Sequence, residues 1–138
     1  MGGLLAAREI GIETGGIAPK GWLTENGSQE VLLRSFGLTE CEQEGFPERT
    51  RRNVDNSSGT LLVGPYEMGG SRLTFEVATE LKKPLFLAEF ENTPNVEEFR
   101  RWLERNKIQV LNVAGNRESQ SPGIEEFTRQ FLLKALWL

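Results

Sequence analysis

The chain has 138 residues, of which 26% are charged, and a formal net charge of −4. This length fits one domain with a single core, and the acidic balance argues against a general affinity for nucleic acid. The sequence contains no histidine, which excludes Ser-His-Asp and Cys-His catalysis and removes the commonest ligand of transition metals. We therefore expect no metal site built from protein side chains.

Cys41 is the only cysteine, and it lies between Glu40 and Glu42, whose negative charges disfavour a reactive thiolate. A single cysteine cannot form an internal disulfide, which favours a cytoplasmic location. No apolar run approaches the length of a membrane span, and the opening residues MGGLLAARE lack the pattern of a secretory signal. We expect a soluble, cytoplasmic protein without a membrane partner.

The N-terminal half is predicted to form a helix over residues 4–10, a short strand over 16–18 and a helix over 29–36. The segment 47–56 is polar and rich in arginine, with few side chains to bury. We expect this segment to be helical and to lie over a binding site.

The second half alternates short apolar runs with helical patterns. Strands buried on both faces are predicted at residues 60–63, 85–88 and 108–113, and helices at 73–81, 96–103 and 124–135, with breaks at 82–84, 92–95 and 121–123. Right-handed crossovers turn this order into an α/β, Rossmann-like three-layer sandwich with a mainly parallel sheet. We expect residues 1–138 to form a single ligand-binding domain.

Ligands of such sheets bind beyond the carboxyl ends of the strands. The loop after strand 60–63 leads into YEMGGSRLTFE, residues 66–76. Gly69 and Gly70 allow the backbone to approach an anion at a helix start, and Ser71, Arg72 and Thr74 add side-chain donors. A glycine pair also makes an ordinary strand-to-helix turn, which is the favoured interpretation of the pair taken alone.

The loop after the third predicted strand reads NVAGNRES and is also rich in polar side chains. Its candidate ligand-binding residues are Asn112, Gly115, Asn116, Arg117, Glu118 and Ser119. Two polar loops with glycines at one sheet edge favour a shared pocket that holds a phosphate group. The alternative for Arg117 is a surface ion pair.

Two further segments add candidate residues to this edge. Arg49 and Asn53 lie on the predicted helix 47–56, and Lys20 lies in GGIAPKGW. The alternative for the arginines of that helix is a solvated face paired with glutamates, and the alternative for Lys20 is a simple turn residue.

These segments resemble the molybdenum-carrier family over nearly the whole chain. The shared segments occur in the family's order and are GGIAPKGW, PERTRRNV, SSGTLLV, GGSRLTFEVATELKKP and VLNVAGNRES. Bacterial and algal members of that family are linked to carrying molybdenum cofactor, and the wider Rossmann-like group includes the cytokinin-activating nucleotide phosphoribohydrolases. The resemblance implies a protein that carries or protects a phosphorylated heterocycle, most simply molybdenum cofactor (molybdopterin), whose own dithiolene holds the metal.

The chain departs from the family's pattern at its start. It begins at Met1-Gly2-Gly3, which corresponds to the first turn of the family's first helix. The resemblance therefore implies that the family's first strand and one glycine loop are absent from this sequence. Either these elements lie outside this sequence, or another chain completes the sheet. Because a sheet that lacks a strand exposes apolar edges, we expect a homo-oligomer. Ser58 stands where relatives commonly have Asp, so an acidic contact is also expected to be lost.

The same resemblance bears on catalysis. The phosphoribohydrolase motif Pro-Gly-Gly-x-Gly-Thr-x-x-Glu is similar to the segment from Gly69 to Glu76, but Arg72 and Leu73 replace its later Gly and Thr. Thr50 stands where that family has a lysine after its arginine. Glu76 is a catalytic candidate only for a hydrolase or sensor of nucleotide-derived ligands, and binding without turnover is the preferred hypothesis.

Overall fold

The computed structural model describes residues 1–41, 46–67, 69–90 and 95–136. Its helices are α1 (Gly2–Ile10), α2 (Glu30–Ser35), α3 (Phe46–Asp55), α4 (Gly69–Glu80), α5 (Val96–Arg105) and α6 (Ile124–Leu136), with a 3-10 turn η1 (Lys20–Trp22). Its strands are β1 (Gly16–Ala18), β2 (Leu23–Thr24), β3 (Gly27–Ser28), β4 (Leu38–Glu40), β5 (Gly59–Val63), β6 (Leu85–Ala88) and β7 (Leu111–Gly115). None of the helices in these ranges is long and apolar enough to span a membrane.

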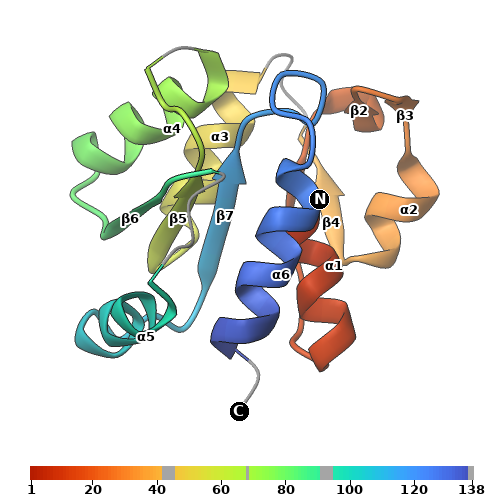
Figure 1. The fold of residues 1–138 in the computed structure, drawn as a ribbon. Coiled ribbons are helices and arrows are strands. Elements are labelled where there is room, and N and C mark those ends of the chain that lie inside the picture. The colour runs from red at the N-terminus through yellow and green to blue at the C-terminus, as the bar shows by residue number, and fades with distance from the viewer. Residues whose placement is uncertain (42–45, 68, 91–94, 137–138) are drawn as a thin grey trace.

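The main sheet is parallel, with the strand order β6-β5-β7. Every residue of the central strand β5 is buried, as expected for a strand covered on both faces. A second parallel ladder joins β1 to β4, and β2 pairs with β3 as a small antiparallel hairpin. Figure 1 shows helices around these strands, and the α/β, Rossmann-like prediction is confirmed.

Apolar side chains cover the two faces of β5 separately. On one face, residues of α1, α5 and α6 pack against Leu61 and Val63 of β5, and the aromatic rings of Phe99 and Phe131 lie 5.0 Å apart. On the other side, Val54 of α3 packs with Val77 and Ala78 of α4. The result is the expected arrangement of helix, sheet and helix layers.

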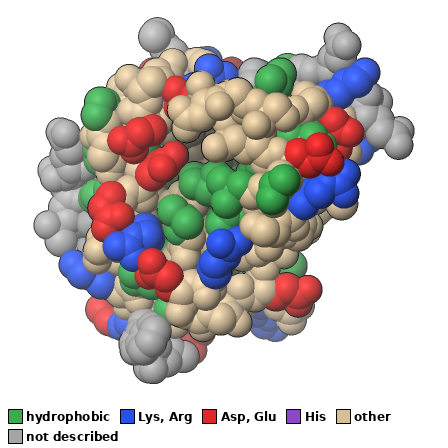
Figure 2. Space-filling view, turned by 90° about the vertical axis from the view of Figure 1, so that its right-hand side faces the viewer, with side chains coloured by type: hydrophobic (Ala, Val, Ile, Leu, Met, Phe, Trp, Pro, Cys, Tyr) green, Lys and Arg blue, Asp and Glu red, His purple; other side chains and the backbone are tan. Residues whose placement is uncertain are grey.

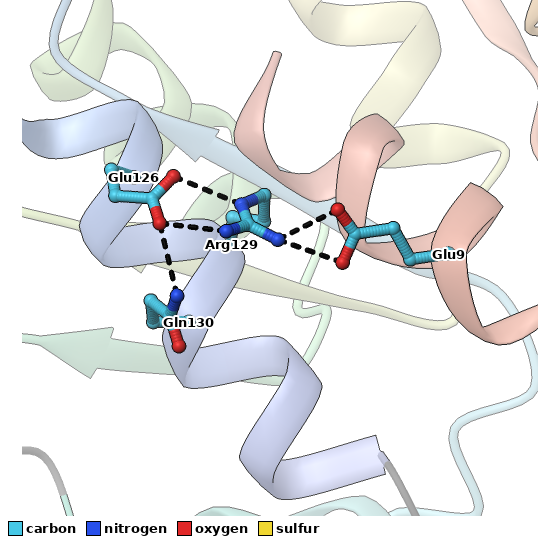
Figure 3. Close-up of polar contacts among 4 residues, drawn as sticks. All are labelled: Glu9, Glu126, Arg129 and Gln130. Atoms are coloured by element: carbon cyan, nitrogen blue, oxygen red, sulfur yellow. Dashed lines mark hydrogen bonds and ion pairs between the residues drawn. The ribbon is translucent and has the colours of Figure 1, made fainter.

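Helix α1 is held against α6 by charged side chains as well as by packing (Figure 3). Arg129 of α6 donates to both carboxylate oxygens of Glu9 at 2.6 and 2.7 Å, and to Glu126 at 2.7 and 2.9 Å. Gln130 donates to Glu126 as well. We call Arg129, Glu9 and Glu126 the α1–α6 clamp.

The β1–β4 ladder has its own small cluster of buried residues, Ala18, Trp22 and Leu33. Asn53 connects this ladder to α3, because its carboxamide accepts from the Ile17 N–H at 2.9 Å and donates to the Ile17 carbonyl at 3.1 Å. This is the pairing that a neighbouring strand would offer to Ile17.

Apolar side chains are also exposed around the N-terminal elements. Figure 2 shows hydrophobic side chains grouped among charged ones on the face at the right of Figure 1. Ile12, Leu23 and Val31 are the exposed large hydrophobic residues of the segment 11–40, and Val31 on α2 is 86% exposed.

Most of the predicted elements are found, but one strand is displaced. The run 108–113 was predicted as a strand, whereas β7 begins at Leu111. The N–H groups of Gln109 and Val110 instead donate to the Ser58 hydroxyl oxygen, each at 2.9 Å, so the chain turns there before it joins the sheet. Strands β2, β3 and β4 were not predicted, and residues 92–94 of the predicted break lie outside the described residues.

Candidate functional site

Two of the predicted loops meet at the carboxyl edge of the main sheet. Val63 and Gly115, the last residues of β5 and β7, are paired in register. Beyond them, the Ser71 hydroxyl at the start of α4 donates to the Asn116 carboxamide oxygen at 2.8 Å. Asn116 also donates to Ser121 just before α6, at 3.3 Å. This network connects the beginning of α4 to the β7–α6 loop, as the sequence predicted for one shared edge.

The glycines of this edge differ in what they allow. A Cβ atom on Gly69 or Gly70 would meet nothing within 4 Å, so the first turn of α4 faces open space. Gly69 has φ of 68°, which favours glycine, so it also serves the turn. At Gly115 a Cβ atom would lie 2.7 Å from the Val63 carbonyl oxygen, so that glycine allows β7 to approach β5.

The charge of Arg117 in the β7–α6 loop acts on Arg49 of α3. Burial lowers the pKa of Arg49, and the positive charge of Arg117 lowers it further. A guanidinium stays charged in proteins, so the two side chains carry like charges that act on each other. An anion bound between them would relieve their repulsion and gain charge-assisted hydrogen bonds.

Arg72, which the sequence also placed at the ligand, lies along α4. Its Nε donates to Glu76 at 2.8 Å, and its Nη1 donates to the Glu67 carbonyl at 3.5 Å. The Arg72 and Glu76 side chains are 60% and 54% exposed. The Thr74 hydroxyl donates to the Gly70 carbonyl at 3.1 Å, within the same helix. In this structure, Arg72, Glu76 and Thr74 therefore contact α4 and the turn before it.

Two of the predicted residues in NVAGNRES support the fold. The Glu118 carboxylate accepts from the N–H groups of Gly123 at 2.6 Å and Glu125 at 3.1 Å, and these bonds lower the pKa of Glu118. Glu118 therefore caps the start of α6. Asn112 lies inside β7 and donates to the Thr60 hydroxyl at 3.3 Å.

Lys20 and Asn53 lie toward the smaller ladder. Lys20 is exposed at the start of η1, where the Gly21 N–H donates to Glu40 at 2.6 Å. Trp22, which follows Gly21, is buried and has a φ of 58°, which is unusual for a bulky residue. Asn53 uses both ends of its carboxamide on Ile17, so it braces α3 against β1.

One contact at this edge was not predicted. The Ser119 hydroxyl donates to the carboxylate of Glu25, which lies in the turn of the β2–β3 hairpin. No local pattern relates residues 94 positions apart, so this contact could be found only from the three-dimensional structure. Over the ranges that the structure describes, no cluster of three or more His, Cys, Asp or Glu side chains is arranged to hold a metal ion.

Comparison with known proteins places this chain in a family. A model of the circularly permutated YpsA SLOG family matches residues 1–136. The chain belongs to that family. The structure is also similar to the crystal structure of a "putative molybdenum carrier protein" from Syntrophus aciditrophicus SB, with a TM-score of 0.86 and 32% identity. That alignment covers 99% of this chain and 87% of the other, and the sequence-based recognition is confirmed.

Among proteins with curated descriptions, none matches this member of the SLOG family. The name of that solved protein concerns a carrier of molybdenum, which is a statement about that protein. The carboxyl edge of this SLOG-family chain presents the open turn at Gly70 and the Ser71–Asn116 bond beside the loop that contains Arg117.

Proposed function

We propose that this protein binds and carries a phosphorylated heterocyclic ligand at the carboxyl edge of β5 and β7, and that the ligand is molybdenum cofactor or its metal-free form, molybdopterin. The observation that carries the proposal is the Ser71–Asn116 hydrogen bond. It holds the open first turn of α4 beside the loop that contains Arg117.

The phosphate supplies the strongest contact in this proposal. The N–H groups at the start of α4 and the positive end of the helix dipole favour an anion. Arg117 and Arg49 add guanidinium groups, whose forked donors match phosphate oxygens. Lys20, exposed on η1, is proposed as a further positive contact.

Carriage without turnover agrees with the position of Glu76. An acid–base or electrostatic catalyst must reach the reacting atoms, whereas the Glu76 carboxylate is paired with Arg72 on an exposed part of α4. A carried cofactor needs shelter and a grip on its phosphate, and its own dithiolene holds the metal. Because Cys41 is a buried free thiol, we place this function in the reducing cytoplasm.

Calorimetric titration with a phosphorylated pterin, a nucleoside monophosphate and inorganic phosphate tests the proposal. We expect Arg117→Ala and Arg49→Ala each to weaken binding of the phosphorylated ligands by about ten- to a hundredfold. Arg101→Ala, on the exposed surface of α5, is the matched control and should bind as the unmodified protein does. Equal affinities in all of these variants would place the ligand elsewhere.

The hydrolase alternative is tested in the same samples. Incubation with nucleoside monophosphates should release no free base if the protein is a carrier. Release of base that disappears in Glu76→Gln would replace the carrier proposal by a phosphoribohydrolase-like activity. Mass spectrometry of the protein purified from its native host would then identify the ligand in either case.

A further inference from the structure

The β2–β3 hairpin is a small projection at the ligand edge. Its strands pair Leu23 with Ser28 and Thr24 with Gly27. The Thr24 hydroxyl donates to the Gly27 carbonyl at 2.9 Å and accepts from the Asn26 N–H at 3.1 Å, so the turn is stabilised from within. Glu25 lies exposed in this turn.

The hairpin reaches the β7–α6 loop through its turn. The Ser119 hydroxyl donates to the Glu25 carboxylate, and Figure 1 shows the hairpin and this loop at the same end of the molecule. Ser119 is two residues after Arg117 and three after Asn116, which is bonded to Ser71. Glu25 therefore contacts the same loop that contributes Arg117 to the proposed phosphate site.

The Glu25 carboxylate is chemically similar to the phosphate group of the proposed ligand. A carboxylate and a phosphate are both negatively charged acceptors, and a serine hydroxyl is a donor suited to either. Glu118, the residue between Arg117 and Ser119, uses its own carboxylate to cap α6. Glu25 thus accepts the hydrogen bond from the Ser119 hydroxyl. Its negative charge lies against the loop that contains Arg117.

We propose that Glu25 is a built-in competitor for the ligand's anionic group, and that its contact with Ser119 holds the hairpin across the ligand edge until a phosphorylated ligand displaces it. This inference rests on the proposed function. It makes the hairpin a latch, named here the Glu25 latch, that regulates access to the site. A purely structural contact would instead stabilise the hairpin without affecting anion affinity.

Hydrogen exchange of the ligand-free protein tests whether Glu25 and Ser119 hold the hairpin. We expect amides of residues 23–28 to exchange about two- to fivefold faster in Glu25→Ala and in Ser119→Ala than in the unmodified protein. Glu104→Ala, which removes an exposed carboxylate from α5, is the control and should leave these rates unchanged. Unchanged rates in both hairpin variants would overturn the latch.

Titration with inorganic phosphate and a nucleoside monophosphate tests the competition. Glu25→Gln keeps an acceptor for Ser119 but removes the charge, and should bind each probe about two- to fivefold more tightly. Glu104→Gln makes the same change in net charge and should not. Equal or weaker binding in Glu25→Gln overturns the competition. If no protein binds either probe, the proposed function and the competition both fail, whereas a failure of Glu25→Gln alone leaves the proposed function standing.

Discussion

The Ser71 hydroxyl and the Asn116 carboxamide, 45 positions apart in sequence, are joined by a hydrogen bond of 2.8 Å. Ser71 is only 3% exposed, so its hydroxyl has little access to water as a substitute partner. This bond sets the spacing between the first turn of α4 and the loop that holds Arg117.

Removing the carboxamide from this pair should therefore cost both stability and binding. We expect Asn116→Ala to lower the free energy of unfolding by about 1–3 kcal/mol, because a buried hydroxyl loses its acceptor. Urea denaturation of Asn116→Ala, Ser71→Ala and the double variant measures the coupling. Additive effects would show that the two side chains do not act as a pair.

Gly70 and Gly69 offer a matched test of the open space at α4. Gly70→Val should fold normally, since a Cβ atom at this position would meet no neighbour within 4 Å, yet it should block ligand approach to the backbone. Gly69→Val should lose roughly 1–2 kcal/mol of stability, because φ of 68° is strained for a branched residue. Thermal melts and calorimetric titration separate the two. Unchanged affinity in Gly70→Val would remove this turn from the site.

Arg49 is expected to contribute a positive charge to ligand binding. Replacing it with methionine keeps most of the side chain's volume but removes the partly buried guanidinium on which the charge of Arg117 acts. We expect Arg49→Met to weaken phosphate binding by about ten- to a hundredfold, because a charge-assisted hydrogen bond is lost. Calorimetric titration with inorganic phosphate measures this, and a variant that binds phosphate normally would show that Arg49 does not contact the ligand.

The α1–α6 clamp makes stability sensitive to acid. Hydrogen bonds from Arg129 lower the pKa of Glu126 from 4.5 to about 2, so the clamp stabilises the fold fully above the ordinary value of 4.5. Its contribution is lost as the pH falls from 4.5 toward 2. The melting temperature of Glu126→Gln should therefore lie below that of the unmodified protein at pH 7, and the two should converge at low pH. A constant difference down to pH 2.5 would contradict this, and Glu104→Gln is the control.

Exposed apolar side chains near α2 favour self-association. Val31 is 86% exposed, and Leu23 is 52% exposed on the same part of the chain. We predict a homo-oligomer that covers this surface, so that light scattering at micromolar concentration gives more than the monomer mass of 15.5 kDa. Val31→Glu should shift the protein toward monomer. A monomeric mass for the unmodified protein would end this prediction.

The helices and strands that the sequence predicted in the second half of the chain are those that contain a continuous apolar run or stripe. Strands β5 and β6 and the helices α4, α5 and α6 were found because each buries its own run or stripe of side chains. Strand β4 was missed because its residues, LTE, carry no such run and become a strand only by pairing with β1. Its partner is 22 positions away in register, so no local pattern reveals it.

The candidate site was predictable in location more than in detail. The sequence indicated that Ser71 and Asn116 would lie at one edge, because parallel strands end together. It also assigned Asn53 to the ligand, whereas the structure places both ends of that carboxamide on Ile17. Which polar side chain pairs with the backbone groups of Ile17 depends on how α3 packs in the folded protein. The local sequence around Asn53 does not contain that information.

The division of the parallel strands into two ladders also shapes how the protein opens. The β1–β4 ladder is stabilised by a small cluster, whereas the larger cluster surrounds β5. Partial unfolding should therefore begin with the N-terminal ladder while β6-β5-β7 stays intact. Such an event would free Asn53 from Ile17 and loosen α3, the helix that also carries Arg49. If the protein carries a ligand as proposed, loss of the N-terminal ladder would release it well before the chain unfolds as a whole.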